Sequence, residues 1–371
     1  MSKILVLGTG AAQADLIRTC KARGWEVFAV TYRSGDIGQQ FADHFEEINI
    51  VDEETVKEYA KSNVIDYIYS TGSDIAMPTA FGVSEELGLN SFCKPRTAII
   101  CNNKHLLRTE LGADFEGNVP FQCLTDKNEE ITIPYPFMIK PVDSQGQRGV
   151  FRIENREDLL ARFDESMSFS RSKKLIIEQF ISGEEISVNT YSANGKIVFS
   201  LISGRESWEG YTGGLIHKHY IPVRWKDDNI LIERVISLVS RTLSKLEINN
   251  GPAYFQIKIT ADKKPYIIEV TPRLDGCHMW RLIRYSTGVD LMELTVNAIE
   301  NKDIPERFTY STLPYETEFM CSAPDITFNK ADFELGNYEF LEWYYQDGDI
   351  VHRMNGYKEK CGYVIRKLHQ Y

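Results

Sequence analysis

Short apolar runs alternate with amphipathic helical segments over the first quarter of the chain. An apolar run at residues 4–7 is followed by a glycine turn, by a helical pattern that ends at Gly24, and by a second apolar run at residues 27–30. The same order recurs with a helical segment at residues 53–61. Strands that alternate with helices in this way form parallel sheets. We therefore expect residues 1–95 to form a doubly wound α/β domain.

The first glycine turn resembles a dinucleotide-binding fingerprint only in part. Gly8 and Gly10 follow a strand and open a helix, but Gln13 stands at the third glycine position. No acidic residue ends the second strand, where the chain reads Thr31-Tyr32. Two of the features that bind pyrophosphate and ribose are therefore missing. The pattern favours a tight strand-to-helix turn over a bound nicotinamide cofactor.

The pattern changes after the first domain. Residues 96 to about 125 are helical in pattern, and a long amphipathic helix is expected at residues 229–248. Strands are predicted in between, in the segments PFMIKPV, KLIIEQFI and EISVNTYSANGKIVFSLIS. We expect a second domain at residues 96–302, with a central lobe at about 125–185. Residues 303–371 are rich in aromatic residues and short strand-like runs, which predicts a small β-containing appendage.

Composition excludes several classes of protein. A chain of 371 residues with 43% hydrophobic and 26% charged residues is typical of a globular protein with two or three domains. A net charge of −11 argues against a nucleic-acid partner. The seven cysteines are scattered without a Cys-x-x-Cys pair, so neither disulfides nor a thiolate metal site is expected. No apolar stretch approaches the ~18 residues of a membrane span, and we expect a cytoplasmic protein without a membrane partner.

The segment FMIKPVDSQGQRGV, residues 137–150, carries the first chemical signal. Lys140 ends an apolar strand, and a polar loop with two glycines follows it. One interpretation is a surface β-turn with an incidental lysine. The other is a phosphate site, in which Lys140 supplies the charge and the backbone N–H groups of residues 144–149 surround the anion.

Three further signals accompany this loop in a fixed order. Lys104 lies in a helical segment, and the segments LIIEQFISGEEISV and PYIIEVTPRLDG come later in the chain. Each alone is compatible with a solvated side chain, a capped strand or a surface ion pair. In this order and spacing, over about residues 1–300, the chain resembles the ATP-grasp superfamily. The resemblance is to the branch that contains carbamoyl-phosphate synthetase halves, biotin carboxylase, formate-dependent purine enzymes and L-amino-acid ligases.

The resemblance implies a fold and a cofactor. The expected fold is an N-terminal doubly wound domain followed by the two α+β lobes of the ATP-grasp fold, which hold ATP between antiparallel sheets. Lys104 and Lys140 would contact the phosphates, and Glu185 would receive the ribose hydroxyls. The remaining nucleotide-binding positions belong to the lid over the phosphates and to the hinge beside the adenine: Ser144, Gly146, Arg148, Gly149, Glu178, Gln179, Phe180 and Ile181.

The same resemblance implies a metal site for Mg²⁺, with Mn²⁺ as an alternative. Glu269 would bridge two ions, and Gln256 and Thr271 would complete the site. Mg²⁺ prefers hard oxygen ligands and keeps part of its coordination shell for phosphate and water. Most relatives have Asn where this chain has Thr271, which puts tight binding of the second ion in doubt. Arg273, together with Lys140, would stabilise the transferred phosphoryl group and the acyl phosphate.

The substrate site is expected in the segments before the long helix and after Arg273. Arginines there could pair with a substrate carboxylate, although a surface-exposed helix with scattered basic residues remains an alternative. The end of a parallel strand is a second expected ligand site. The candidate substrate residues are Asp74, Arg205, Gly213, Gly214, His217, His278 and Arg281.

We expect a stand-alone carboxylate–amine ligase that releases ADP and phosphate. Its partners would be a small-molecule carboxylate and an amine, and the acid would be an amino acid, a peptide or a sugar acid. The sequence leaves open whether the protein forms a homodimer. One alternative is a purine-type enzyme that uses formate or bicarbonate. The other is a nucleotide-binding protein of this fold without turnover, which Gln256 and Thr271 together would suggest.

Overall fold

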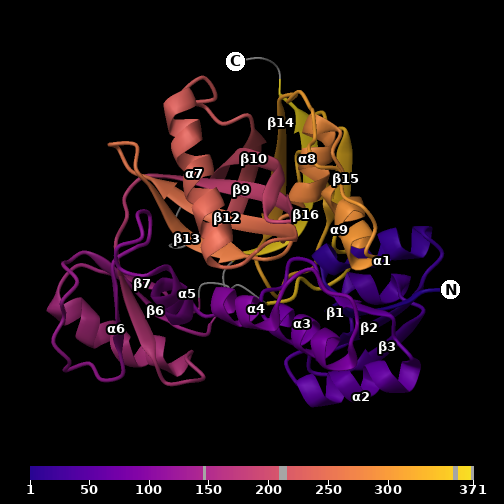
Figure 1. Cartoon of the computed structure of the whole chain (residues 1–371), viewed down its shortest axis with the longest axis horizontal. Coiled ribbons are helices and arrows are strands. Elements are labelled where there is room, and N and C mark those ends of the chain that lie inside the picture. Colours follow the sequence, from indigo (N-terminus) through magenta and orange to yellow (C-terminus); the bar gives the residue numbers. More distant parts are fainter. Residues whose placement is uncertain (145–147, 209–214, 354–357, 369–371) are drawn as a thin grey trace.

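The computed structural model describes residues 1–144, 148–208, 215–353 and 358–368. The strands form three separate sheets, and the helices pack on their faces (Figure 1). None of the helices in the described part of the chain is long and apolar enough to cross a membrane.

The N-terminal sheet is parallel throughout, with the strand order β3-β2-β1-β4. This confirms the expected doubly wound α/β architecture. Its strands are β1 (Lys3–Leu7), β2 (Glu26–Thr31), β3 (His44–Glu47) and β4 (Tyr67–Tyr69). Its helices are α1 (Ala11–Ala22), the short 3₁₀ helix η1 (Ile37–Phe41), α2 (Glu53–Asn63) and α3 (Ala76–Leu87).

The glycine turn between β1 and α1 is the tight turn that the sequence predicts. Gly8 has a φ of +99°, and Gly10 is the N-cap of α1. A Cβ at Gly8 would lie 3.3 Å from the side chain of Gln13. The Gln13 amide donates to the carbonyl oxygen of Thr71, in the loop after β4. Gln13 therefore fills the space beside the turn and ties it to the neighbouring strand.

The helical segment after the first domain is shorter than expected. Helices α4 (Pro95–Asn102) and α5 (Lys104–Leu111) are separated by Asn103, and strand β5 (Phe121–Leu124) follows. Asn103 is extended, and its side chain accepts a hydrogen bond of 3.2 Å from the amide of Leu106. Such a cap begins a new helix. The helical pattern predicted up to about residue 125 is therefore confirmed only as far as Leu111, where α5 ends, and residues 121–124 form a strand instead.

A second sheet of four antiparallel strands has the order β5-β8-β6-β7. The remaining strands are β6 (Phe137–Pro141), β7 (Phe151–Ile153) and β8 (Leu175–Gln179). Helix α6 (Arg156–Ser168) covers one face with Leu159 and Phe163, which are buried against apolar side chains of the sheet. This small α+β layer carries the glycine loop at the end of β6.

The third sheet has eight antiparallel strands in the order β13-β12-β9-β10-β11-β14-β16-β15. Five of them precede the C-terminal segment: β9 (Glu184–Ala193), β10 (Lys196–Ser207), β11 (Ile216–Ile221), β12 (Gly251–Ile259) and β13 (Pro265–Thr271). The others are β14 (Tyr315–Ser322), β15 (Phe340–Trp343) and β16 (Glu359–Lys367), and a 3₁₀ helix η2 (Lys330–Asp332) precedes β15. The C-terminal segment contains strands, as expected. It continues the central sheet through the pairing of β11 with β14, which the sequence did not predict.

One face of the large sheet is covered by the amphipathic helix α7 (Asn229–Lys245). Val235, Leu238 and Val239 of this helix share a buried cluster with Phe255 and Ile257 of β12. Full burial of such a side chain stabilises a fold by about 1.5–3 kcal/mol. The expected amphipathic helix is confirmed.

The opposite face of the large sheet is apolar in one part and polar in another. Alternate residues of a strand point to opposite sides, so residues two apart share this face. Far from the second sheet, this face is apolar, with Tyr191 and Phe319 buried in the cluster that also contains helices α8 (Met279–Thr287) and α9 (Leu291–Ile299). Nearer to the second sheet, the same face carries Glu185, whose carboxylate contacts both Arg205 and Gln256.

Candidate functional site

Side chains from the three sheets meet around Glu269 of β13. Glu269 lies opposite Gln256 of β12 in the antiparallel ladder. Burial and the nearby charge of Asp74 raise the pKa of Glu269, against the opposing effects of Lys104 and Arg273. No hydrogen bond or ion pair joins the Glu269 carboxylate to another described residue. The site therefore contains a half-buried carboxylate whose charge lacks a direct partner among the described residues.

Arg273 is held in place by Asp74, which follows strand β4. The Arg273 Nε donates to the Asp74 Oδ1 at 2.6 Å, and another guanidinium nitrogen donates to the carbonyl oxygen of Leu274 at 2.8 Å. Burial alone would raise the pKa of Asp74, but Arg273 and the hydroxyl of Thr271 lower it. The pair joins the N-terminal sheet to β13, so Asp74 orients the guanidinium.

Lys104 and Lys140 approach the site from α5 and β6. The Lys104 Nζ donates to the carbonyl oxygen of Ser144 at 2.7 Å, at the start of the glycine loop. Burial lowers the pKa of Lys104, and the charge of Lys140 lowers it further, whereas Glu269 and Glu178 act in the opposite direction. The structure thus brings together the lysines, the loop and Glu269, which the sequence only placed in order along the chain.

Glu178 is buried between two cations. Its carboxylate accepts from the Arg108 Nε at 2.7 Å and from the Lys140 Nζ at 2.5 Å. Burial raises the pKa of Glu178, but Arg108 and Lys140 together lower it to about 2. Arg108, which is 1% exposed, also donates to the carbonyl oxygen of Ile268 at 3.0 Å. Sequence reasoning missed Arg108, because one arginine in a short helix is usually solvated.

In the segment after β8, the backbone amide of the buried residue Ile181 has no acceptor among the described residues. The amide of Gln179 donates to Pro120, at 2.9 Å, and that of Phe180 donates to Pro136, at 3.2 Å. The amide of Ile181, which is buried, donates to no described residue. A buried N–H without an acceptor is costly, so Ile181 is the position in this segment with capacity to bind a ligand.

Glu185 of β9 contacts residues of the strands that neighbour β9 in the large sheet. Its carboxylate lies 2.8 Å from the Arg205 Nε and 3.8 Å from the Lys258 Nζ. It also accepts from the Gln256 Nε2 at 2.6 Å, which leaves the Gln256 amide oxygen available for another partner. Arg205 additionally donates to the hydroxyl of Tyr254.

The remaining loop and substrate candidates are only partly described. Gly149 has a φ of +74°, and its carbonyl oxygen accepts from the Ser166 hydroxyl at 2.7 Å, which anchors the end of the glycine loop to α6. Arg148 is exposed. His217 pairs with Glu318 at 2.9 Å. The predictions for Gly146, Gly213 and Gly214 lie outside the described residues.

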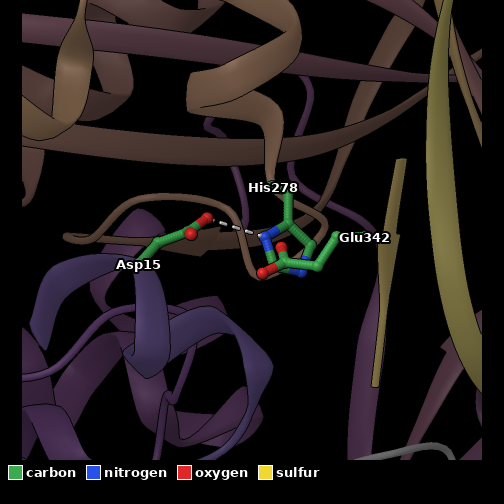
Figure 2. Close-up of side chains that lie close together, drawn as sticks. All are labelled: Asp15, His278 and Glu342. Carbon is green, nitrogen blue, oxygen red and sulfur yellow. Dashed lines mark hydrogen bonds and ion pairs between the residues drawn. The ribbon is translucent and has the colours of Figure 1, made fainter. Parts of the chain in front are cut away.

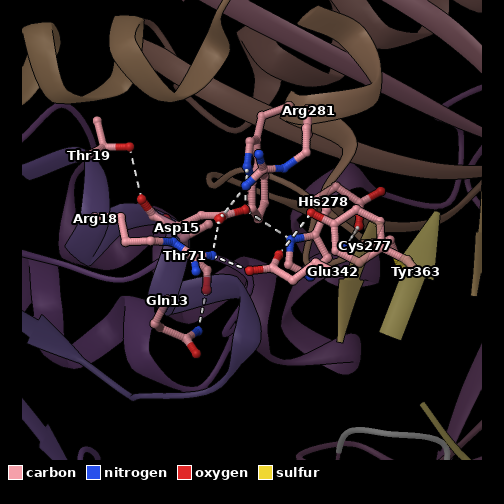
Figure 3. A network of polar contacts seen from close by, with 12 residues as sticks. Gln13, Asp15, Arg18, Thr19, Thr71, Cys277, His278, Arg281, Glu342 and Tyr363 are labelled. Carbon is pink, nitrogen blue, oxygen red and sulfur yellow. Dashed lines mark hydrogen bonds and ion pairs between the residues drawn. The ribbon is translucent and has the colours of Figure 1, made fainter. Parts of the chain in front are cut away.

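His278 and Arg281 belong to a buried network around Asp15 of α1 (Figures 2 and 3). Asp15 accepts from the His278 Nδ1 at 3.1 Å, from Arg281 at 2.6 Å and from Arg18 at 2.7 Å. The other ring nitrogen of His278 lies 2.9 Å from the Tyr344 hydroxyl. Both ring nitrogens are thus used within the protein, so the expected substrate contact of His278 is not supported by its position. Arg281 is likewise engaged by Asp15.

Asp15, His278 and Glu342 also have the composition of a metal site, with ligand atoms within 4.8 Å of one another (Figure 2). Arg18 contacts Asp15 and lies 2.5 Å from Glu342, and Arg281 contacts Asp15. Two guanidinium groups already balance the two carboxylates, so a divalent cation would add uncompensated positive charge. We interpret the network as a structural ion-pair network that holds α1, α8 and β15 together. Its one signal in the sequence is a charged residue, Asp15, within the apolar stripe of the first helix.

Comparison with known proteins places this arrangement in a family. The ATP-grasp domain family matches residues 133–280. Formate-dependent phosphoribosylglycinamide formyltransferase from Prochlorococcus marinus strain MIT 9515 is 27% identical over 316 residues, which cover 82% of this chain and 77% of the relative. The protein of the same name from strain NATL2A is 31% identical over 322 residues, which cover 82% of this chain and 78% of the relative. This chain belongs to the ATP-grasp superfamily.

A solved structure agrees with this assignment over the full length of this chain. The L-amino acid ligase from Bacillus licheniformis superposes with a TM-score of 0.83 at 18% identity, covering 100% of this chain and 94% of that one. The comparisons confirm the predicted fold and the branch of carboxylate–amine ligases. ATP with Mg²⁺ is the cofactor of this family.

Proposed function

We propose that this chain is an ATP-dependent ligase that activates a carboxylic acid as its acyl phosphate and couples it to an amine. The observation that carries the proposal is Glu269, a half-buried carboxylate without a direct partner among the described residues, near the cations Lys104 and Arg273. Burying a charge is costly unless it is paired or binds a metal. This combination supports a site for a polyanion with a divalent cation.

The donor set fits Mg²⁺. Glu269 would supply a carboxylate oxygen, and Gln256 would supply its amide oxygen, since its nitrogen faces Glu185. Thr271 would supply a hydroxyl oxygen from the same strand. Hard oxygen ligands with few carboxylates suit Mg²⁺ that also binds phosphate. When bound, this ion neutralises phosphate charge and polarises the transferred phosphoryl group.

The other residues would bind the nucleotide and the activated acid. Lys104 and Lys140 would hold phosphate oxygens, and the free amide of Ile181 would contact the adenine edge. Arg273, oriented by Asp74, would contact the acyl phosphate. The amine nitrogen then bonds to the carbonyl carbon, the C–O bond to phosphate breaks, and its electron pair leaves with the phosphate while the amine loses a proton to solvent.

A second candidate function concerns the identity of the acid. The curated relatives reported above are named formate-dependent phosphoribosylglycinamide formyltransferases, which favours formate as the acid and a ribonucleotide amine as the acceptor. The name of the L-amino acid ligase, whose structure superposes with a TM-score of 0.83, favours an amino acid instead. Both reactions use the same acyl-phosphate chemistry.

The reaction class predicts its nucleotide product. Incubation with Mg²⁺, ATP, a carboxylic acid and an amine should release ADP and phosphate, because the γ-phosphoryl group is transferred. Phosphate release would be measured across a panel of formate, bicarbonate, amino acids and sugar acids, each with and without amines. AMP and pyrophosphate would exclude the acyl-phosphate route. No acid-dependent phosphate release across the panel would favour a binding protein without turnover.

Replacing Lys140 by alanine should weaken ATP binding by roughly 1.5–3 kcal/mol, about 10- to 150-fold, the cost of one charged hydrogen bond to phosphate. Arg108 would remain to balance Glu178, so the fold should persist. Calorimetric titration with ATP and Mg²⁺ measures the effect, and thermal unfolding checks the fold. Lys264→Ala in the exposed turn after β12 is the matched control. Equal ATP affinity in wild type and Lys140→Ala would contradict the assignment.

A further inference from the structure

The guanidinium group of Arg108 connects three segments of the proposed nucleotide site. Its Nε donates to the Glu178 Oε1 on β8 at 2.7 Å, one Nη donates to the Asn118 Oδ1 at 3.3 Å, and the other donates to the carbonyl oxygen of Ile268 on β13 at 3.0 Å. Arg108 itself lies on α5, one helical turn after Lys104. A single side chain therefore joins the helix of Lys104, the strand before the proposed adenine segment and the strand that carries the proposed metal ligands.

Asn118 holds Arg108 in place from the other side. The Asn118 amide nitrogen donates to the carbonyl oxygens of Arg108 and Gly112 at 3.0 Å each, at the C-terminal end of α5. The carbonyl oxygen of Gly117 accepts from the amide of Ile267 on β13 at 2.8 Å. Both the backbone and the guanidinium group of Arg108 are thus tied to a segment that is itself fixed to β13, so the guanidinium group has a defined position.

Glu178 divides its two carboxylate oxygens between two cations. Its Oε1 accepts from Arg108, and its Oε2 accepts from the Lys140 Nζ at 2.5 Å. Burial raises the pKa of Glu178, but the two cations lower it to about 2, so the carboxylate is ionised at neutral pH. The cluster therefore carries two positive charges and one negative charge. The side chain of Lys140 is 12% exposed and that of Arg108 is 1% exposed, so the surplus positive charge is accessible at Lys140.

Without Arg108, the Glu178 carboxylate would have Lys140 as its one cationic partner in this cluster. The two side chains would then form a buried ion pair with zero net charge. A carboxylate at hydrogen-bonding distance cancels most of the attraction of an ammonium group for a second anion. A phosphate group could therefore bind Lys140 only in competition with Glu178.

We infer that Arg108 is a positioning residue for the nucleotide phosphates: it neutralises Glu178, so that the charge of Lys140 stays available for a phosphate oxygen. The inference rests on the proposed function, which identifies the anion at Lys140 as a phosphate of ATP. Arg108 acts through Lys140 and does not contact the phosphates itself, because its guanidinium group is buried against protein acceptors.

The affinities of two ligands, one with phosphates and one without, test the inference. Calorimetry in the presence of Mg²⁺ would give the affinity of a non-hydrolysable ATP analogue relative to that of adenosine. Arg108→Met should lower this ratio by about tenfold or more, because Lys140 then shares its charge with Glu178. Arg108→Lys keeps the cation and should keep most of the ratio. A purely structural role of Arg108 would weaken both ligands alike and leave the ratio unchanged.

A second substitution should restore the ratio. In the double variant Arg108→Met/Glu178→Gln, the carboxylate that competes for Lys140 is absent, and we expect a ratio within about threefold of the wild type. Glu178→Gln alone should keep or raise the ratio, since Lys140 is then unshared. Thermal unfolding would show which variants are folded. If Arg108→Met is unfolded, Glu178→Gln decides: a ratio below that of the wild type would overturn the inference.

The control is an ion pair of the same kind at the surface. Arg96 on α4 pairs with Glu110 on α5 at 2.8 Å, and the Arg96 side chain is exposed. Arg96→Met, Glu110→Gln and their double variant should all keep the wild-type ratio.

The outcomes separate this inference from the proposed function. An unchanged ratio in folded Arg108→Met, or a ratio that stays low in the double variant, would overturn the inference even if ADP and phosphate are released in the ligase assay. A wild type that binds the ATP analogue no more tightly than adenosine would contradict the phosphate site and the inference together. A ratio that falls in Arg108→Met and recovers in the double variant would support the inference, and a lack of acid-dependent ADP release would then contradict the ligase reaction alone.

Discussion

Replacing Glu269 by glutamine should abolish ATP-dependent turnover while leaving the fold intact. Glu269 is the one carboxylate among the three proposed metal ligands, and Gln256 and Thr271 are neutral. Without it, no protein charge would attract the second ion, and the loss of several kcal/mol of transition-state stabilisation corresponds to a decrease of at least about 100-fold in kcat. The amide is nearly isosteric, and no described hydrogen bond or ion pair of Glu269 is lost.

The measurement is phosphate release with the acid and amine found by the substrate panel, at increasing Mg²⁺ concentration, with thermal unfolding as the check on folding. Gln256→Glu is the informative companion variant, because it adds a second carboxylate to the proposed metal ligands and should lower the Mg²⁺ concentration needed. Wild-type turnover in Glu269→Gln would show that the metal assignment is wrong.

The largest effect on stability is expected from Glu178→Gln. Arg108 and Lys140 would keep their charges and lose the carboxylate that balances them, and Arg108 is 1% exposed. Removing one partner of a buried ion pair costs roughly 3–5 kcal/mol, because the other charge stays buried without compensation. Urea unfolding at neutral pH measures the loss. Glu154→Gln, which removes an exposed pair with Arg152, is the matched control and should have little effect.

The pH dependence of unfolding provides an independent check on Glu178. Its pKa is lowered from an ordinary value of 4.5 to about 2 in the folded protein. The ionised carboxylate therefore stabilises the fold fully above about pH 4.5, and this contribution is lost as the pH falls from about 4.5 towards 2. The free energy of unfolding of the Glu178→Gln variant should therefore decrease less than that of the wild type between about pH 4.5 and pH 2. An identical acid dependence in both proteins would contradict the role of the buried pair.

The sequence predicted the local elements whose patterns are complete within a short segment. The alternation of apolar runs and helical segments in residues 1–95 gives the parallel sheet, and the apolar stripe of α7 gives a helix that covers one face of the large sheet. The pattern was less reliable near the end of the next segment. The helical pattern predicted up to about residue 125 ends at Leu111, and the strand at residues 121–124 was not predicted.

The order of Lys104, Lys140, Glu269 and Arg273 was enough to indicate the family, which the comparisons confirmed. Their roles in catalysis remain predictions. In the structure, Glu269 and Lys140 lie near Lys104, and their charges therefore alter the pKa of Lys104. Order along the chain therefore predicted a set of residues, and the fold brought them together.

The partners of these residues were decided by tertiary structure alone. Glu178 and Arg108 are 70 residues apart, Arg273 and Asp74 are 199 apart, and His278 and Asp15 are 263 apart. Such pairs leave no periodic signal, because periodicity reports only which face of one element is buried. Lys360 reaches Cys277 because the C-terminal strands continue the central sheet beyond β11. The sequence by itself determined the elements and the reaction family, whereas long-range strand pairing decided which charges are balanced and which remain available for a ligand.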